Sequence, residues 1–369
     1  MERYNRQMIL KGFGAEGQQR LAQAKVLVVG AGGLGCPALQ YLAAAGVGTI
    51  GIIDGDTISL SNLHRQTLYT PNEVNRFKAE VAAEKIRVQN PDITIQAIVK
   101  DLLPTNIFDI IAAYDIIMDG TDNFPTRYLI NDACVLTEKP LVYAAIAQYE
   151  GQVGVFNAKD HRGERLNYRD LFPNPPKVGE IPNCAEAGVI GVLPGIIGTM
   201  QAAEIIKLIT GIGKPLINQV LTYNLLAQET FALQVTKNPK SDALIPKNRT
   251  ELEQRDYGYI CSTNLTEITV DDFQNLLKKG NVSVVDVREY GEKPSIQNIE
   301  YQQIPLSVLA TEFQTIKHDT VVFICQSGIR SLKAMQWLKS STDQKQIFSL
   351  KGGINELKNT IYAERTQEN

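Results

Sequence analysis

A glycine-rich turn between an apolar run and a helix-forming run restricts this chain to few folds. Residues 25–29 are typical of a strand buried on both faces, and residues 36–45 are rich in helix formers. The turn between them contains Gly30, Gly32, Gly33 and Gly35. Because glycine has no side chain, backbone N–H groups and the N-terminus of the next helix can approach a phosphate there. The turn therefore predicts a parallel α/β sheet that binds a nucleotide.

An acidic residue after the second predicted strand bears on which nucleotide is bound. Residues 49–54 form that strand, and Asp54 lies about 20 residues beyond the glycines, where a dinucleotide-binding fold places the acid that holds a ribose. A dense polar cluster with one leucine follows: Asp56, Ser61, Asn62, Leu63, His64, Arg65 and Gln66. Such a cluster suits a polyphosphate and its metal ion. An NAD or FAD oxidoreductase, the usual interpretation of the glycine pattern, has no obvious use for it.

Two further segments supply polar groups to the same region. Residues 72–89 have the apolar spacing of a helix that carries Lys78, and a buried strand over residues 114–119 is followed by Asp122 and Asn123. Ligands of an open parallel sheet gather at the carboxyl ends of its strands. We therefore expect Gly33, Asp54 and Asp122 to face one pocket.

The rest of the first half completes this unit. Two strands are expected within residues 140–156, further strands within 219–235, and between them a helix that ends at Gly211. Residues 157–183 form a proline-containing loop that ends at Cys184. A loop of this length in a compact domain is more often functional than incidental.

Composition excludes several classes of protein. The 369 residues are enough for two domains, and a net charge of −3 gives no overall basic face for nucleic acid. The N-terminus lacks the apolar core of a signal peptide, and no run approaches the roughly 20 apolar residues of a membrane span. The odd number and wide spacing of the cysteines predict no disulfide framework. They are Cys36, Cys134, Cys184, Cys261 and Cys325. We expect a soluble cytoplasmic protein in which Cys36 and Cys134 are core residues.

A second α/β unit is expected after a polar, broken stretch. We predict a first domain over residues 1–236, a linker over 237–263 and a smaller domain over 264–369. The smaller domain contains predicted strands at 282–287, 320–324 and 346–350, and a helix at 331–339.

The informative part of the second unit is the loop from Cys325 to Ser331. A cysteine directly after a buried strand lies where converging backbone N–H groups, a helix N-terminus and here Arg330 favour the reactive thiolate. Cysteine phosphatases and rhodanese sulfurtransferases both use such a loop. Phosphatases have five residues between the cysteine and the arginine, and this chain has four. The spacing favours sulfur transfer.

Taken together, these motifs resemble two known families. The glycine loop, Asp54-Gly-Asp56, residues 61–66, Lys78, residues 119–123 and Cys184-Ala-Glu-Ala-Gly188 resemble the MoeB/ThiF family, bacterial relatives of ubiquitin-activating enzymes. Residues 286–289, the Cys325 loop and residues 350–353 resemble a rhodanese domain. The domain order is that of the molybdopterin-synthase sulfurylase type. The resemblance implies a Rossmann-like doubly wound sheet followed by a small α/β rhodanese domain.

The first resemblance implies an adenylation reaction that uses ATP and Mg²⁺. A small ubiquitin-like sulfur-carrier protein ending in Gly-Gly would attack the α-phosphate of ATP with its terminal carboxylate, forming an acyl adenylate and pyrophosphate. The glycine loop would cradle phosphate and Asp54 would hold the ribose. Asn62, Arg65 and Lys78 would meet the triphosphate, and Asp122 would hold Mg²⁺. Arg6 would reach the partner subunit's site in a homodimer.

The second resemblance implies sulfur transfer through Cys325. This residue would take sulfane sulfur from a persulfide donor, such as a cysteine desulfurase, and its persulfide would displace AMP from the acyl adenylate. Cys184 would then release the thiocarboxylate by attacking the acyl disulfide. The order in which Cys184 first forms a thioester is equally compatible with the sequence.

Two departures from the family patterns stand out. Many relatives hold zinc with two CxxC pairs, the first written Cys-Tyr-Arg-Cys, whereas this chain has Asn167-Tyr-Arg-Asp170 and no CxxC after Phe231. We therefore predict no structural zinc. In the second unit, the usual His-Ile-x-Gly-Ala stretch is reduced within residues 299–305.

The sequence does not name the carrier. The small subunit of molybdopterin synthase is preferred, the thiamine-pathway sulfur carrier is an alternative, and carriers for tRNA thiolation or cysteine synthesis also end in Gly-Gly. A non-catalytic scaffold that binds such a carrier is the alternative to an enzyme.

Overall fold

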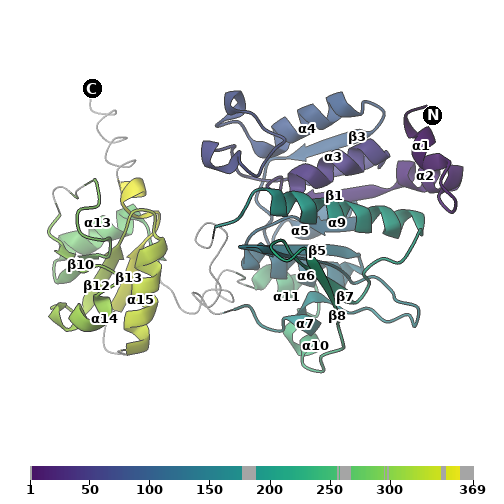
Figure 1. The fold of residues 1–369 in the computed structure, drawn as a ribbon. Coiled ribbons are helices and arrows are strands. Elements are labelled where there is room, and N and C mark those ends of the chain that lie inside the picture. Colours follow the sequence, from purple (N-terminus) through teal and green to yellow (C-terminus); the bar gives the residue numbers. More distant parts are fainter. Residues whose placement is uncertain are drawn as a thin grey trace. The chain divides into compact units, whose positions relative to one another are not determined.

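The computed structural model describes residues 2–176, 188–255, 257, 267–294, 296, 299–341 and 346–357. Its contacts divide the chain into two compact units, of which the first includes the described residues up to 257 and the second those from 267 onward (Figure 1). Cys184 and Cys261 lie outside the described residues. The two units are described separately below.

The first unit is built on one eight-stranded sheet with the order β3-β2-β1-β4-β5-β6-β7-β8. Strands β3 to β5 are parallel, and β6, β7 and β8 continue the sheet antiparallel. The strands are β1 (Lys25–Val29), β2 (Thr49–Ile53), β3 (Thr94–Ile98), β4 (Ile116–Asp119), β5 (Leu141–Ala147), β6 (Glu150–Phe156), β7 (Gln219–Asn224) and β8 (Glu229–Gln234). The chain leaves β1 toward β2 on one side and returns to β4 on the other, so the sheet has a switch point between β1 and β4, where open α/β sheets bind ligands.

Helices cover both faces of this sheet because side chains alternate along the central strands. Val26 and Val28 of β1 belong to the core on one face, and Leu27 and Val29 to the core on the other. The first core is closed by α2 (Gly14–Gln23), α3 (Gly35–Ala45), α4 (Lys78–Gln89) and α9 (Val192–Thr210). The second is closed by α5 (Ile107–Ile111), α6 (Phe124–Thr137), α7 (Tyr168–Leu171) and α11 (Arg249–Gln254). The doubly wound sheet expected from the sequence is confirmed.

The described part of the first unit also contains short helical segments. In the described residues, two of these are α-helices, α1 (Asn5–Met8) and α10 (Ser241–Leu244). The others are 3-10 turns, one before α1 at Glu2–Tyr4 and two in the loop after β2, at Leu60–Asn62 and Pro71–Glu73. The helix predicted over residues 72–89 begins only at Lys78. Residues 75–77 instead pair with the chain near Ile58, whose N–H donates to the Arg76 carbonyl at 2.9 Å.

Helix α9 has a composition that the sequence analysis did not anticipate. Among the described residues it is the one helix that is long and apolar enough to cross a membrane by length and composition alone. Leu193, Ile197 and Ile205 are nevertheless fully buried in the cores of the first unit. Gly211, in the left-handed conformation (φ +78°), ends the helix as predicted.

The described part of the expected linker packs against the first unit. Leu252 of α11 is fully buried in the second core, and Tyr257 joins it there. The Tyr257 hydroxyl donates to Asp132 at 2.8 Å, and Arg255 lies 3.4 Å from the same carboxylate. Two apolar anchors and these polar contacts are enough to hold a stretch whose composition is that of a linker.

The second unit is a five-stranded parallel sheet with the order β11-β10-β12-β13-β9. Its strands are β9 (Glu267–Ile268), β10 (Val282–Asp286), β11 (Gln302–Gln303), β12 (Thr320–Ile324) and β13 (Gln346–Leu350). Its helices are α13 (Val270–Lys279), α14 (Leu309–Glu312), with a 3-10 turn at Phe313–Thr315, and α15 (Ile329–Ser341) (Figure 1). The predicted strands agree with β10, β12 and β13 to within one residue, whereas β9, β11 and α13 were not anticipated.

Candidate functional sites

The glycine loop lies at the carboxyl end of β1, next to the end of β4. Gly30 has a positive φ (+93°), and a Cβ there would come within 2.8 Å of the Gly120 carbonyl. A Cβ on Gly35 would lie 2.0 Å from the Gly30 carbonyl. At these two positions the turn has no room for a side chain, so glycine is required there for steric reasons.

Asp54, at the end of β2, is held against this loop. Its carboxylate accepts hydrogen bonds from the N–H groups of Ala31 and Asp56, both at 2.8 Å. Burial raises the pKa of Asp54, and the charge of Lys78 and the two N–H bonds oppose that rise. The carboxylate thus ties β2 to the glycine loop, at the place where the sequence predicts a ribose.

Lys78 is the first residue of α4 and is almost fully buried. Its Nζ lies 2.7 Å from Asp56 Oδ2, and the Asp56 side chain is 74% exposed. The hydroxyl of Tyr69 donates to the carbonyls of Ala31 (2.8 Å) and Lys78 (3.2 Å), which joins the start of α4 to the glycine loop. A cation is therefore fixed close to this loop.

The polar cluster after β2 forms a local hydrogen-bond chain. Arg65 Nη2 donates to Asn62 Oδ1 at 2.7 Å, and Arg65 Nη1 lies 2.8 Å from His64 Nε2. Asn62 in turn donates to Ser59 Oγ at 3.1 Å, which lies 2.7 Å from Ser61 Oγ. A Cβ on Gly33 would lie 3.6 Å from Arg65 Cγ, so the arginine stem lies beside the glycine loop.

The end of β4 is organised by a buried ion pair that the sequence analysis did not single out. Asp119 accepts from Arg127 Nε at 3.0 Å, and both side chains are buried. Arg127 also donates to the Thr121 and Ala144 carbonyls, both at 3.1 Å. Gln201 of α9 donates to the Asp119 carbonyl at 2.8 Å. Arg127 lies in α6 and Gln201 in α9. No local sequence pattern distinguishes them from other polar residues of these helices, so they could not be predicted as part of the site.

The remaining predicted residues of the first unit lie at the surface or outside the described chain. Asp122 and Asn123 are exposed after β4, and Asn123 Oδ1 caps α6 by accepting from the Thr126 N–H at 2.9 Å. Arg6 is exposed on α1. Leu63 is half-buried against the first core. The structure thus groups the glycine loop with Asp54, Asp56, residues 61–66 and Lys78, and it leaves the roles of Arg6, Asp122 and Cys184 as predictions.

The residues around the glycine loop fit a nucleotide. Gln66 is 4% exposed, its Oε1 has no hydrogen-bond partner within the described chain, and its Nε2 would lie 3.5 Å from a Cβ on Gly32. A buried polar group beside the loop is therefore free to bond a ligand. No group of three or more metal-ligating side chains occurs in the described parts of the chain. Mg²⁺ bound with a nucleotide needs only one or two carboxylates besides phosphate oxygens.

The residues at the expected zinc position do not fit a structural zinc ion. Both oxygens of the buried Asp170 are occupied: Oδ2 accepts from the N–H and Nδ2 of Asn167, each at 2.9 Å, and Oδ1 accepts from Ser241 Oγ at 2.6 Å and the Asn238 N–H at 3.0 Å. Lys237 Nζ lies 3.3 Å from the same carboxylate. Hydrogen bonds to Asp170 therefore join the segment around Asn167 to the segment that contains Asn238 and Ser241.

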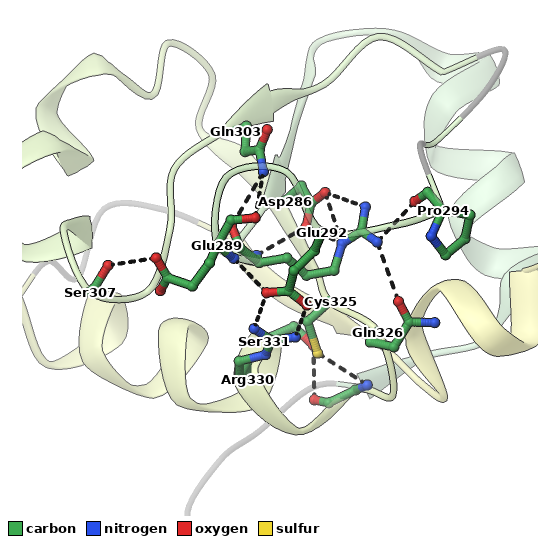
Figure 2. Close-up of polar contacts among 12 residues, drawn as sticks. Asp286, Glu289, Glu292, Pro294, Gln303, Ser307, Cys325, Gln326, Arg330 and Ser331 are labelled. Atoms are coloured by element: carbon green, nitrogen blue, oxygen red, sulfur yellow. Dashed lines mark hydrogen bonds and ion pairs between the residues drawn. The ribbon is translucent and has the colours of Figure 1, made fainter.

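The Cys325 loop lies between β12 and α15 in the second unit. Cys325 is 1% exposed, and its Sγ accepts from the Gly328 N–H at 3.2 Å and lies 3.5 Å from Ser331 Oγ (Figure 2). The Ile354 N–H donates to the Cys325 carbonyl at 2.9 Å, and a Cβ on Gly353 would come within 2.2 Å of that oxygen. The segment after β13 therefore supports the loop from behind.

The two arginines of this site are already paired. Arg330 makes two hydrogen bonds to Glu292, at 2.6 and 2.8 Å (Figure 2). The buried Arg288 is bonded to Asp286, with Nη2 2.8 Å from Oδ2. The hydrogen bond from Arg330 lowers the pKa of Glu292 to about 2. Arg330 was expected to act as a positive charge beside the thiol. Glu292, 38 residues away in the chain, was not anticipated as its partner.

Two cysteines are expected to be unreactive in the folded protein. Cys36 and Cys134 are fully buried, as predicted, and burial raises the pKa of Cys36 to about 12 and that of Cys134 still further. Because the thiolate is the form that reacts, iodoacetamide at pH 8 should leave both unlabelled, as peptide mass mapping would detect. Labelling in denaturant is the control. Rapid modification of either residue in native protein would contradict this assignment.

Comparison with protein-family models identifies both units. The ThiF family model matches residues 4–244, and the rhodanese-like domain model matches residues 269–360. A "sulfur carrier protein adenylyltransferase" of Thermus thermophilus is 48% identical over 71% of this chain and 96% of its own length. A "probable adenylyltransferase/sulfurtransferase MoeZ" of Mycobacterium tuberculosis is 39% identical over 95% of this chain and 91% of its own length.

The fold of the first unit also occurs in solved structures. Escherichia coli MccB with ATP matches 64% of this chain and 72% of its own, with a TM-score of 0.52 and 22% identity, a likeness that concerns the fold alone. The family model covers well over half of the chain, and the two curated relatives align over most of their length. The chain therefore belongs to the ThiF family, carries a rhodanese-like domain after its ThiF unit, and is an enzyme of the adenylyltransferase/sulfurtransferase type.

Proposed function

We propose that this enzyme uses ATP to adenylate the C-terminal glycine of a small ubiquitin-like sulfur-carrier protein and then transfers sulfur to it, forming a thiocarboxylate. The observation that carries the proposal is that one chain combines a nucleotide-type glycine loop flanked by Asp54, Arg65 and Lys78 with a rhodanese-type Cys325 loop. The names of the curated relatives, one of which acts on a sulfur carrier protein, support it.

In the adenylation step, the terminal carboxylate attacks the α-phosphorus of ATP and pyrophosphate leaves. The two reactants repel each other, so the site must neutralise charge. Backbone N–H groups near Gly32 and Gly33 would bind phosphate, Asp54 would accept from the ribose hydroxyls, and Lys78 and Arg65 would hold the triphosphate. Asp122 would be the carboxylate ligand of Mg²⁺, which would neutralise phosphate charge. Arg6 would complete the site of a second subunit in a homodimer.

In the sulfur step, the Cys325 thiolate attacks the sulfane sulfur of a donor persulfide, a new S–S bond forms and the donor thiolate leaves. The Cys325 persulfide then attacks the acyl carbon of the adenylate, and AMP leaves. Cys184 would attack Sγ of Cys325 to release the thiocarboxylate and form a disulfide that cellular thiols reduce. In the alternative order Cys184 forms a thioester first.

The carrier is proposed to be the small subunit of molybdopterin synthase, with the thiamine-pathway carrier as the alternative and the cytoplasm as the location. The test is ATP–pyrophosphate exchange with each purified carrier, followed by mass analysis of the carrier after addition of a persulfide donor. We expect exchange with one carrier and then the mass gain of replacing a terminal oxygen by sulfur. No exchange with any of these carriers would favour the scaffold alternative.

The role of Cys325 is tested separately by the Cys325→Ala protein. Exchange should be retained, because adenylation does not use this thiol, and thiocarboxylate formation should be lost. A full rate of thiocarboxylate formation would disprove the role of the rhodanese loop while leaving adenylation in place.

A further inference from the structure

The charges around the Cys325 loop restrict which sulfur donor can use it. The carboxylates of Asp286, Glu289 and Glu292 lie near this loop (Figure 2). Two guanidinium groups, those of Arg288 and Arg330, bond to carboxylates of this segment. Both guanidinium groups are bonded to carboxylates of this set. These two arginines are therefore paired and offer an incoming anion no free guanidinium.

Arg330 is the more exposed of the two arginines. Its side chain is 33% exposed, and that of its partner Glu292 is 32% exposed, whereas Arg288 is almost completely buried. The Glu292 hydrogen bonds raise the pKa of Arg330 most, and the nearby Cys325 sulfur also raises it. The guanidinium belongs to the same short loop as the thiol and is partly exposed, but its fork of donors is occupied by a carboxylate (Figure 2).

Sulfur donors differ in the charge that they bring to this place. Thiosulfate is a dianion whose sulfonate oxygens match a guanidinium fork. An organic persulfide carries at most one negative charge on the group that reacts. In both reactions the Cys325 thiolate attacks the sulfane sulfur and the S–S bond of the donor breaks. Sulfite leaves when the donor is thiosulfate, and a thiolate leaves when the donor is an organic persulfide.

We propose that Glu292 is a specificity-determining residue that, by occupying Arg330, makes the Cys325 loop a poor acceptor of sulfur from thiosulfate and reserves it for organic persulfides. This inference rests on the proposed sulfur-transfer function of Cys325. Glu292 acts through Arg330 and does not itself react.

The test compares two donors on the whole protein. Thiosulfate and the persulfide of N-acetylcysteine methyl ester, which has no other charge, are offered in single turnovers. Persulfide on Cys325 is then measured by peptide mass analysis. Wild-type protein should react faster with the organic persulfide. Glu292→Gln should raise the second-order rate constant for thiosulfate about tenfold, as expected for freeing one nearby cation, and change that for the organic persulfide little.

Glu289→Gln is the matched control. Glu289 belongs to the same segment, but its carboxylate accepts from Ser307 Oγ at 3.1 Å. Its replacement removes the same charge without freeing Arg330, so the ratio of the two donor rates should change less than about twofold. The increase in the rate constant for thiosulfate should also be absent from the double variant Glu292→Gln/Arg330→Gln.

Because the readout is a ratio measured on one sample, partial unfolding cannot imitate it. An unchanged ratio in Glu292→Gln, an equal gain in Glu289→Gln, or a wild-type protein that already prefers thiosulfate would each overturn the inference. Absence of a Cys325 persulfide with both donors would instead overturn the proposed sulfur-transfer function, and the inference with it.

Discussion

Replacing Lys78 by alanine is expected to slow ATP–pyrophosphate exchange with the carrier about 100- to 1,000-fold, the range measured when one charge-stabilising donor is removed from an enzyme site. The ammonium group lies at the buried start of α4, close to the glycine loop, and its carboxylate partner Asp56 is exposed. A low-dielectric position strengthens its attraction for a triphosphate.

The control for this variant is Arg76→Ala. Arg76 lies just before the same helix, but its ion pair with Glu84 is at the surface, with 45% and 52% of the side chains exposed. Pairs of this kind contribute about 0–1 kcal/mol, so exchange should be nearly unchanged. Thermal unfolding of both variants checks folding. Exchange within threefold of the wild-type rate in a folded Lys78→Ala protein would remove Lys78 from the adenylation site.

Replacing Asp170 by alanine is expected to destabilise the first unit by about 3 kcal/mol, as measured by urea unfolding. The substitution removes the acceptor of the Asn238 N–H and of the N–H and Nδ2 of the buried Asn167, and each buried unpaired donor costs about 1–3 kcal/mol. Ser241 Oγ keeps the Asn238 carbonyl as an acceptor. It also removes the carboxylate that joins Asn167 to the segment that carries Lys237.

Asp242→Ala is the matched control, because Asp242 binds the same Lys237 but is 70% exposed. Its loss should cost less than about 1 kcal/mol. Equal stabilities of the two variants would show that the Asp170 network does not hold the segments together. If the network takes the place of a metal, purified protein should contain no stoichiometric zinc and a chelator should leave its melting temperature unchanged.

The doubly wound sheet, and the grouping of polar residues beside the glycine loop, could be predicted because their signals are local. The glycines at Gly30 and Gly35 are required by contacts within one turn, and Asp54 follows a strand whose alternating apolar residues are visible in the sequence. The same holds for the Cys325 loop between β12 and α15.

The features that were missed depend on residues far apart in the chain. The start of α4 is set by pairing between residues 75–78 and residues 56–58, so helical periodicity extended it too far. Glu292 meets Arg330, and Gln201 meets the end of β4, only once the sheets have formed. Leu252 and Tyr257 are too few to distinguish a packed segment from a linker by composition.

The support of the Cys325 loop by Gly353 and Ile354 has a consequence for the order in which the two sites arise. Gly353 leaves no room for a side chain beneath the loop, and Ile354 fixes the Cys325 carbonyl. During synthesis the Cys325 loop therefore cannot adopt its final conformation until Gly353 and Ile354 have been added to the chain. The residues grouped around the glycine loop, as far as Lys78, have emerged long before. The ribosome therefore completes the residues of the proposed adenylation step before those of the sulfur step, which is the order in which the proposed reaction uses them.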